Sequence, residues 1–337
     1  HPVAAHAPGE LLTPDLLGPV WETLMASTDR RAQGAHFTPR STAEVVAGHV
    51  FDQVDRSGVP IVWDPAVGGG AFLLAAAREI EARTRAPRSR IVAALHGSDI
   101  DPVALRVADA AVELWATGGV RPRLARFDAL VEYWPDPPTG GFDVVLGNPP
   151  FLGQLHADTA RSEERRALLR ERFGSAAGGY VDEAGLFLLR AVRGAAAGGV
   201  VGMIVPQSLL GAAAARRLRT ALSDEAALVG VWVGEPDEFA ASVEVVAPVL
   251  RRGASPGASI AVWGRDSGER SVAMPSDRSW ATALSGTFGV PAVSLEGSGT
   301  LGDIATVTSG FRQHFYGIAD AVIERDIESD SGIDPEA

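Results

Sequence analysis

The amino-acid sequence predicts an α/β fold built on a doubly wound, mostly parallel β-sheet. Two observations lead to this prediction. Short apolar runs alternate with longer amphipathic segments between residues 61 and 252, and strands separated by helical segments of about 12–17 residues are typical of parallel sheets. In addition, several of the apolar runs end in an acid, an amide or glycines. The carboxyl ends of strands are where open α/β sheets bind their ligands.

The first elements of the chain are expected to be helical. Residues 11–33 have a helical pattern that Pro14 and Pro19 interrupt early, and the sequence HFTPR at 36–40 is typical of a turn. Apolar residues then recur at helical spacing as far as Phe51, which predicts an amphipathic helix.

Strands and helices alternate from here to residue 252. Runs of β-branched and apolar residues predict strands, and apolar residues spaced by three and four predict helices. The expected strands are IVWDP (61–65), IVAALHGSDI (91–100), one within PRLARFDAL (122–130), FDVVLG (142–147), GVVGMIVP (199–206), AALVGVWVG (226–234) and VEVVAPVLRR (243–252), the last two as a closing hairpin. The expected helices span residues 71–85, 101–117, 182–196 and 208–222.

A glycine-rich turn joins the first of these strands to its helix, in the sequence DPAVGGGAFL (64–73). Glycines let the backbone turn tightly and approach a ligand closely, and the N-terminus of the following helix favours a carboxylate or a phosphate. The turn has neither the lysine of a phosphate-binding loop nor the glycine spacing of the dinucleotide fingerprint. It predicts a small-molecule site of another kind, and a purely structural turn is the alternative.

Acidic residues follow further strands. Asp99 in GSDIDP is placed to accept hydrogen bonds from both hydroxyls of a ribose, whereas Asp101 before Pro102 is the better candidate for a helix cap. Asp128 in FDAL would accept from the exocyclic amino group of an adenine, or cap a turn. Together with Asp64 after the first strand, these acids predict a site that binds adenosine. Because no phosphate-binding loop accompanies it, the ligand would be an adenosine that carries an amino acid, which is S-adenosylmethionine.

The fourth strand ends in the sequence GNPPF (147–151). Prolines cannot continue a sheet ladder, so the strand is expected to stop near Leu146 and to be followed by a stiff loop. Asn148 offers an amide oxygen, Pro149 a carbonyl and Phe151 a flat ring. This loop is suited to hold a planar amino group, and a proline-rich turn that only caps the strand is the alternative.

In this order, HFTPR, DPAVGGGAFL, GSDIDP and GNPPF resemble the motifs of the amino-group DNA methyltransferases that make N6-methyladenine. The resemblance is to the type with a C-terminal target-recognition domain, as in type II and IIG restriction–modification and BREX-like phage-defence systems. GGVVGMIVPQSLL (198–210) is similar to a late strand and loop of that family. The resemblance covers about residues 30–252 and depends on the combination of motifs. Val67 and Gly69 depart from it, since the family commonly has Cys and Ser there, but this turn acts through its backbone.

The resemblance implies a Rossmann-like methyltransferase fold with a seven-stranded sheet, and S-adenosylmethionine as the cofactor. Thr38 and the glycine turn would hold its methionine part, with Asp64 near the ammonium group, while Asp99 would hold the ribose and Asp128 the adenine amino group. Phe187 would pack on the adenine ring. The complete expected cofactor set is Thr38, Asp64, Pro65, Ala66, Gly68, Gly70, Asp99, Ile100, Asp128, Ala129, Asn148 and Phe187.

The resemblance also implies the expected catalytic set, Asn148, Pro149, Pro150 and Phe151. Asn148 and the Pro149 carbonyl would accept hydrogen bonds from the N6 amino group of a target adenine, and Phe151 would stack on the base. A base inside a duplex cannot reach such a pocket, so it would be flipped out. Alignment would dominate the reaction, because direct methyl transfer needs little acid–base chemistry.

The composition limits the possible partners. The net charge is −12, cysteine is absent and the seven histidines have no metal-ligand spacing, so we expect no disulfides, no thiolate catalysis, no metal and a cytoplasmic location. We expect no membrane span, because no apolar run is long enough. All 30 basic residues are arginine. The arginines cluster within 161–172 and 216–219, where they would attract double-stranded DNA without sequence preference or simply solvate helix faces.

The expected domain organisation has four parts. An N-terminal helical segment spans residues 1–35, a methyltransferase domain 36–252 and a Gly/Ser/Pro-rich linker 253–300. Residues 301–337 resemble the start of a target-recognition domain, and this acidic segment is too short to recognise a site alone. Specific methylation is therefore expected to need further C-terminal sequence or a specificity or defence-system subunit.

Three other functions remain open at this stage. Methyltransferases that modify protein glutamine or RNA guanine use a similar Asn-Pro-Pro-aromatic loop, though usually with tyrosine last. A non-catalytic module that binds cofactor and DNA within a larger complex is a second alternative, and the intact loop argues against it. A dinucleotide oxidoreductase is disfavoured by the glycine spacing and by the Asn-Pro-Pro-Phe loop.

Overall fold

The computed structural model describes residues 13–24, 38–151, 162–178, 181–235, 244–264, 268–276 and 278–290. The chain divides into two compact units, His1–Val290 and Pro291–Ala337, and the described residues all belong to the first. Three sequence expectations therefore lie outside the described residues: the helix beyond residue 24, the first two residues of HFTPR, and the start of a recognition domain at 301–337.

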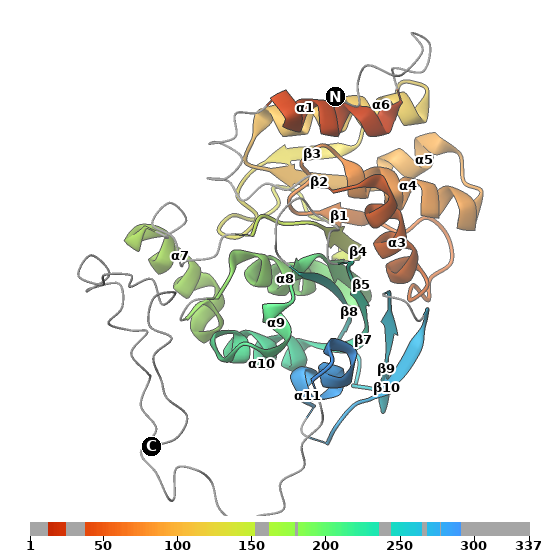
Figure 1. Cartoon of the computed structure of the whole chain (residues 1–337). Coiled ribbons are helices and arrows are strands. Elements are labelled where there is room, and N and C mark those ends of the chain that lie inside the picture. The colour runs from red at the N-terminus through yellow and green to blue at the C-terminus, as the bar shows by residue number, and fades with distance from the viewer. Residues whose placement is uncertain are drawn as a thin grey trace, which may run out of the picture. The chain divides into compact units, whose positions relative to one another are not determined.

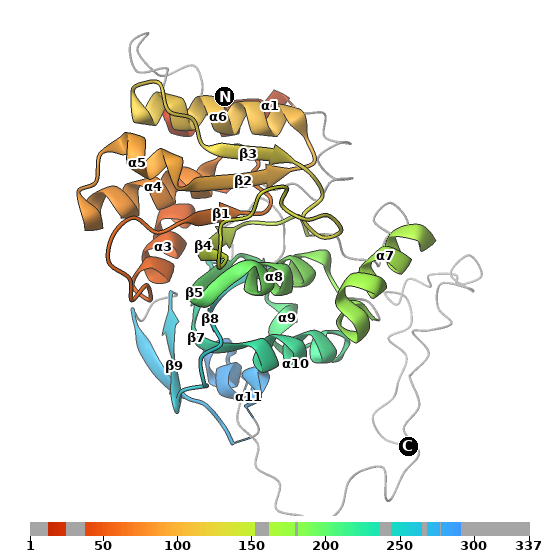
Figure 2. The ribbon, with the colours of Figure 1, turned by 180° about the vertical axis from the view of Figure 1, so that it is seen from behind.

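In the described part of the chain, ten strands form one sheet, shown from opposite sides in Figures 1 and 2. The strand order is β10-β9-β7-β8-β5-β4-β1-β2-β3, and β6 pairs with β8 beside this path. The strands are β1 (Val62–Asp64), β2 (Leu95–Asp99), β3 (Arg123–Arg126), β4 (Phe142–Gly147), β5 (Ala195–Met203), β6 (Val205–Pro206), β7 (Ala226–Val233), β8 (Val245–Arg252), β9 (Ser259–Trp263) and β10 (Arg270–Ala273).

The predicted doubly wound, mostly parallel sheet is confirmed. The strands β1, β2, β3, β4 and β5 pair in parallel, and β8 lies antiparallel between β5 and β7. These seven strands form the methyltransferase-like sheet that the sequence predicted. The strand β9 extends it in parallel with β7, and β10 adds an antiparallel edge.

Helices cover both faces of this sheet (Figures 1 and 2). They are α1 (Leu17–Leu24), α3 (Arg40–Phe51), α4 (Ala71–Thr84), α5 (Arg88–Ala93), α6 (Pro102–Ala116), α7 (Glu163–Phe173), α8 (Glu183–Gly194), α9 (Ser208–Gly211), α10 (Arg216–Glu225) and α11 (Trp280–Leu284), with short 3₁₀ turns η2 (Pro14–Leu16), η4 (Gly174–Ala177), η5 (Ala213–Ala215) and η6 (Ser285–Phe288).

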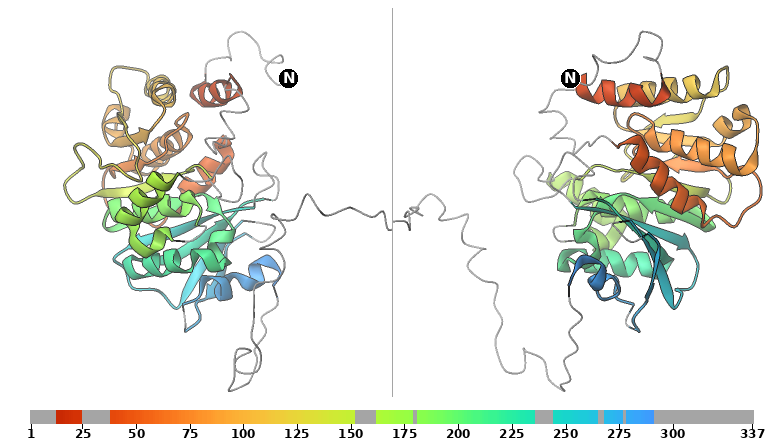
Figure 3. Two further views of the ribbon diagram at one scale, coloured as in Figure 1. Left: turned by 90° about the vertical axis from the view of Figure 1, so that its left-hand side faces the viewer. Right: turned by 45° about the vertical axis from the view of Figure 1, so that its right-hand side comes forward.

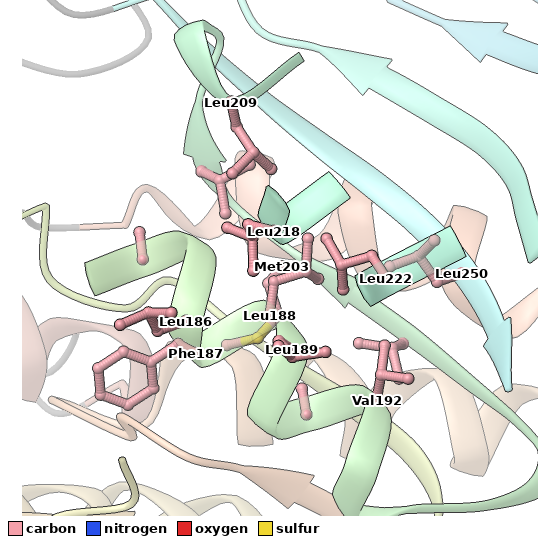
Figure 4. Close-up of a cluster of buried hydrophobic side chains, with 14 of the residues drawn as sticks. Leu186, Phe187, Leu188, Leu189, Val192, Met203, Leu209, Leu218, Leu222 and Leu250 are labelled. Carbon is pink, nitrogen blue, oxygen red and sulfur yellow. The ribbon is translucent and has the colours of Figure 1, made fainter. Parts of the chain in front are cut away.

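Alternating side chains divide the core into two layers. Val144 and Leu146 of β4 pack with α3, α4 and α6, whereas Val145 between them packs with α8 and α10. Successive residues of a strand point to opposite faces, and a strand that is buried on both sides is apolar throughout. Figure 4 shows part of the second layer, where Leu188 and Leu189 of α8 lie near Leu218 and Leu222 of α10.

Two expected elements, a strand and a helix, were wrong in detail. Residues 91–93 belong to the helix α5 and not to a strand, because Pro87 begins a helical turn in which Ile91 and Val92 are fully buried. A short buried helix and a buried strand have the same apolar pattern. The helix expected over 208–222 is broken after Gly211, and Arg219 donates to the carbonyls of Leu209 and Ala212 at this break.

The segment after residue 253 continues the same unit. It was expected to be a linker, but its described residues contain β9, β10 and α11, and α11 packs against α9. Glycine-rich stretches here are the turns between these elements. The sheet therefore extends past the boundary that composition suggested.

Candidate functional site

The carboxyl ends of the central strands bring the predicted polar residues to one edge of the sheet. Asp64 and Asp99 are the last residues of β1 and β2, and Asn148 directly follows β4. Asp64 and Gly147 adjoin so closely that a Cβ at Gly147 would lie 2.6 Å from Oδ1 of Asp64. Asp128 differs from the prediction, because β3 ends at Arg126 and Asp128 lies two residues beyond it.

The glycine turn after β1 has the backbone that its sequence predicted. Gly68 and Gly70 have positive φ angles of 48° and 87°, a conformation that glycine adopts without strain. The N–H of Gly68 donates to Oδ2 of Asp99 (3.0 Å), which ties the turn to the end of β2. A Cβ at Gly68 would meet no protein atom within 4 Å, so open space lies beside this turn.

A cavity of about 60 Å³ lies between this turn and the chain's N-terminal segment. Five of the residues that line it come from the predicted cofactor set, namely Thr38, Asp64, Ala66, Gly68 and Asn148. Residues that sequence reasoning missed close the other side: Pro14, Asp15, Gly18, Pro19 and Arg40. No local sequence pattern could have found them, because only the tertiary fold brings η2 and α1 to the turn.

The N-terminal segment, residues 13–24, is fixed to the rest of the site by a backbone contact and an ion-pair network. A Cβ at Gly69 would lie 2.5 Å from the Cα of Gly18, so the two backbones touch. Asp15 accepts from Arg40 and Arg78, at 3.1 and 2.8 Å. Figure 3 shows α1 lying along α6, with which it is in contact.

Asn148 has one filled and one unfilled hydrogen-bonding group. Its Nδ2 donates to Oγ1 of Thr38 (3.0 Å), whereas its buried Oδ1 has no partner among the described residues. An unsatisfied buried acceptor costs about 1–3 kcal/mol. Thr38, which was expected to contact a cofactor, lines the cavity and also orients the amide of Asn148.

Asp64 is a buried acid without a cationic partner among the described residues. It is 1% exposed, and the backbone N–H of Ala66 donates to its Oδ1 (3.0 Å). Burial raises the pKa of the Asp64 carboxyl to about 8, because the charged form loses its hydration. A cation placed beside this carboxyl would favour its ionised form.

Asp99 and Asp101, the acids at and just after the end of β2, make different contacts in the structure. Asp101 caps α6, since its side chain accepts from the N–H of Val103 (2.7 Å). Asp99 accepts from the N–H groups of Gly68 and Asp101, and a carboxylate has capacity for further bonds. Burial raises the pKa of Asp99. The neighbouring Ile100 is 58% exposed, which leaves an apolar surface beside the acid.

Asp128 is held by neighbours that the sequence did not indicate. Its Oδ1 accepts from the N–H of Leu130 (3.0 Å) and its Oδ2 from Nη1 of Arg165 (2.6 Å). Arg165 also binds Glu183, which is 1% exposed. A charged residue among the apolar positions of α8 was the available signal, and it was not used.

The other residues expected around an adenine ring are buried near this network. Ala129 is 2% exposed and its carbonyl accepts from Nε of Arg190 (3.0 Å). Phe187 is buried on α8, and Figure 4 shows its ring pointing away from Leu218. The residues Asp99, Asp128 and Phe187 do not line the 60 Å³ cavity, so that cavity corresponds to the methionine end of the predicted site alone.

The Asn-Pro-Pro-Phe loop is mostly shielded from solvent. Pro149 is buried and Pro150 is half-buried. Phe151 is half-buried and packs against both core layers. The ring of Phe151 is thus anchored at the sheet edge beside Asn148.

The described arginines of the two runs fall into two groups, those that contact other protein groups and those that are exposed. Arg165 binds two carboxylates, Arg172 stacks on Tyr133 at 3.7 Å, and Arg219 donates to backbone carbonyls. Arg161 lies outside the described residues. Four arginines are exposed and form no ion pair with another described residue: Arg166, Arg170, Arg216 and Arg217.

Within the described ranges, no group of three or more His, Asp or Glu side chains is placed to hold a metal ion. The same ranges contain no helix with the length and apolar character needed to cross a membrane.

Comparison with known proteins identifies a family. The model of the N-6 DNA methylase family matches residues 12–263, which include the glycine turn, the Asn-Pro-Pro-Phe loop and the sheet as far as β9. A curated relative, the release factor glutamine methyltransferase of Chlorobaculum tepidum, is 31% identical over 135 residues. That match covers 38% of this chain and 42% of the relative.

Solved structures share the fold at low sequence identity. The methyltransferase subunit of a type I restriction–modification system from Streptococcus thermophilus has a TM-score of 0.54 at 19% identity, covering 86% of this chain and 60% of that one. The type IIG restriction endonuclease BpuSI has a TM-score of 0.59 at 19% identity, covering 74% of this chain and 29% of that one. The type IIL restriction–modification enzyme MmeI was solved in complex with DNA. It has a TM-score of 0.58 at 17% identity, covering 78% of this chain and 43% of that one. The matches thus cover between 29% and 60% of these proteins.

Proposed function

This chain belongs to the N-6 DNA methylase family, and from this premise we propose that it transfers a methyl group from S-adenosylmethionine to the N6 amino group of adenine in double-stranded DNA. The observation that carries the proposal is the buried Oδ1 of Asn148, an acceptor without a partner among the described residues. It lies beside the cavity at the end of β4. Such an acceptor takes an N–H or O–H donor, and the amino group of an adenine is a donor of this kind.

The residues present fit S-adenosylmethionine on three counts. Asp64 is a buried acid that lacks a cation, and the cofactor carries an ammonium and a sulfonium group. The space beside Gly68 admits a ligand close to the backbone. Asp99 has acceptor capacity next to the exposed Ile100, which suits a ribose and an adenine face. The cavity of about 60 Å³ would hold only one end of the cofactor, since ligand pockets usually measure about 300–1,000 Å³.

In the proposed reaction the chain's own residues align the amino group. Asn148 Oδ1 and the Pro149 carbonyl would accept its two N–H bonds, which draws the nitrogen lone pair out of conjugation with the ring. Thr38 keeps the amide in the required orientation, since it engages Nδ2. Phe151 would stack on the base. Bound S-adenosylmethionine supplies an electrophilic methyl group, and most of the rate enhancement would come from alignment.

The proposed substrate needs a flipped base and a second source of specificity. An adenine stacked in a duplex cannot reach Asn148, so the base would leave the helix. The exposed arginines Arg166, Arg170, Arg216 and Arg217 would contact phosphates. Because the chain spans only part of its restriction–modification relatives, we propose that site recognition uses further sequence or a specificity subunit, in restriction–modification or phage defence.

The match to a glutamine methyltransferase supports a second candidate, methylation of a glutamine side chain in a protein. A glutamine amide would offer Asn148 the same N–H bonds. DNA is favoured because the N-6 DNA methylase model extends over residues 12–263, whereas the glutamine methyltransferase match covers 135 residues. In addition, the loop ends in Phe151 and not in the tyrosine usual for that class.

One experiment separates these candidates. Genomic DNA and total protein from cells that produce the 337-residue chain would be digested and analysed by mass spectrometry. We expect N6-methyladenine in the DNA, none with an Asn148→Ala variant, and no N5-methylglutamine in peptides. Methylglutamine without methyladenine would instead establish the second candidate. If specificity requires a subunit, the same assay is repeated with neighbouring genes co-expressed.

A further inference from the structure

We propose that Arg165 is a positioning residue that fixes the acid expected to recognise the adenine of the cofactor. The inference deepens the proposed function and rests on it. Arg165 was expected to attract nucleic acid or to solvate a helix face, as one member of an arginine run. Its contacts assign it to the interior of the site instead.

The guanidinium of Arg165 bridges two carboxylates from different elements. Its Nη1 donates to Oδ2 of Asp128 at 2.6 Å. Its Nε and Nη2 donate to the two carboxylate oxygens of Glu183, at 2.8 and 2.6 Å. This fork geometry is available to arginine and not to lysine. Arg165 thus joins the loop after β3 to the first turn of α8.

Both ends of this bridge belong to the expected adenine pocket. Asp128 is the acid expected to accept from the adenine amino group. Glu183 lies one helical turn before Phe187, so the two side chains share a face of α8. Phe187 is the residue expected to pack on the adenine ring. Arg165 therefore sets the separation between the loop after β3 and this part of α8.

A second arginine also binds this loop. Arg190 of α8 donates from Nε to the carbonyl of Ala129 at 3.0 Å. It has no carboxylate partner among the described residues, and its guanidinium lies over the ring of Trp63. Asp128 and Ala129 are thus held by one arginine each, one through a side chain and one through the backbone.

The arrangement leaves Asp128 able to act on a ligand. Its two oxygens accept one hydrogen bond each from described residues, from Leu130 N–H and from Arg165, and each carboxylate oxygen can accept another. Glu183 has no such freedom, because it is 1% exposed and Arg165 engages both of its oxygens. Glu183 anchors the guanidinium, and the guanidinium orients Asp128.

The test measures recognition of the adenine amino group by binding and not by turnover. The ligands are S-adenosylhomocysteine and S-inosylhomocysteine, in which a carbonyl oxygen replaces the 6-amino group. Calorimetry of the full chain gives the ratio of their dissociation constants. The principal variant is Arg165→Met with Glu183→Leu, which removes the buried charge together with its partner and so avoids an unpaired buried carboxylate. Arg166→Met, an exposed neighbour, is the matched control.

The wild-type chain is expected to favour the adenosyl ligand by about tenfold or more, as loss of a hydrogen bond to a charged acceptor implies. The double variant should melt within a few degrees of wild type and lose this preference, whereas Arg166→Met should keep it. Asp128→Asn should also lose it, and adding the double substitution to Asp128→Asn should change the ratio no further. If the double variant does not fold, Arg165→Lys is measured, with the same expected loss of preference.

Other outcomes would overturn the proposal in distinguishable ways. A folded double variant, or a folded Arg165→Lys variant, with the wild-type preference would show that Arg165 only stabilises the fold. Equal wild-type binding of the two ligands would show that Asp128 does not read the amino group, and would leave the methyltransferase proposal standing. Failure of the wild-type chain to bind either ligand would count against the cofactor itself, and with it against both proposals.

Discussion

The two ends of the candidate site satisfy their buried polar groups to different degrees. At the methionine end, Oδ1 of Asn148 has no partner among the described residues and Asp64 has a single backbone donor there. At the adenine end, Asp128 and Glu183 are bound by Arg165. An unmet buried acceptor costs stability and is kept where a ligand completes it. A network in which the buried polar groups are already hydrogen-bonded instead stabilises the loop and the helix that would surround the ligand.

This difference predicts where function and stability can be separated. Substitutions at the methionine end remove groups that make few hydrogen bonds in the free protein, so the folded state should tolerate them. Substitutions at the adenine end break existing bonds, so they should affect stability as well as binding unless a compensating change is made. Variants at the two ends should therefore differ in whether binding or activity changes without a change in stability.

The largest effect is expected for Asn148→Ala. The variant loses the unpartnered Oδ1 and a single hydrogen bond, from Nδ2 to Thr38, so the melting temperature should stay within a few degrees of wild type. The methylation rate should fall by about 10²–10³-fold or more, the scale measured when a single group that stabilises a transition state is removed. Cofactor affinity should change only a few-fold, because the contact is to the target amine.

Its matched comparison is Thr38→Val, which removes the partner of Nδ2 but leaves Oδ1 in place. We expect a smaller loss of rate, since the amide loses its orientation and not its acceptor. The rates of both variants are measured on DNA that carries the target site, and thermal melts give their stabilities. Full activity of Asn148→Ala would remove the basis for the base-binding role of the loop.

The next effect is expected for Asp99→Ala. Loss of a paired acceptor for two ribose hydroxyls should weaken binding of S-adenosylmethionine by about 1.5–3 kcal/mol. The control is Asp101→Ala, which removes only the cap of α6 and should lower stability by about 1 kcal/mol without changing affinity. Calorimetric titration and chemical unfolding of both variants compare the two. Unchanged affinity of Asp99→Ala would make this acid a structural cap as well.

The sequence predicted the fold more completely than the boundaries of its elements. The order of β1, β2, β3 and β4 with their helices followed from alternating apolar runs, because that alternation is a local property. Residues 91–93 and the break at Gly211 were missed, because a helical turn over two buried residues and a carbonyl cap from Arg219 depend on tertiary contacts. The extension by β9 was missed for the same reason.

Within the site, sequence located the acceptors but not their partners. Asp64, Asp99 and Asn148 follow strands that are adjacent in a parallel sheet, so their meeting at one edge could be predicted. The contact of Gly18 with Gly69, and the pairing of Arg165 with Asp128 and Glu183, join segments that are distant in the chain. No spacing rule connects such positions, and arginines in a run gave no indication of which would be buried.

A smaller effect is expected for Gly69→Ala. The added Cβ would lie 2.5 Å from the Cα of Gly18, so η2 and α1 must shift, and overpacking of this kind costs about 1–3 kcal/mol. The comparison is Gly68→Ala, whose Cβ meets no protein atom but which has a positive φ. We expect Gly69→Ala to lower the melting temperature more and Gly68→Ala to weaken cofactor binding more. The reverse order would place the ligand under the N-terminal segment and not beside Gly68.

The last prediction concerns the pH dependence of Asp64, whose pKa is raised to about 8 by burial. Between about pH 4 and 8 this carboxyl is protonated in the folded chain and ionised in the unfolded chain. The folded state therefore binds more protons, and its stability falls as pH rises through this window.

Cofactor binding should respond to the same group with the opposite sign. A sulfonium or ammonium group beside Asp64 favours the ionised carboxylate, so binding below pH 8 releases a proton and strengthens as pH rises. The expected gain is about tenfold between pH 6 and 7, where the ligand's own amino group is still protonated. Asp64→Asn should remove both trends, since an amide does not titrate. Calorimetry in two buffers of different ionisation enthalpy counts the released proton, and unfolding curves at each pH give the stability. If the affinity ratio of wild type to Asp64→Asn does not change with pH, no cation of the ligand lies beside Asp64, and the methionine end of the site must be oriented differently.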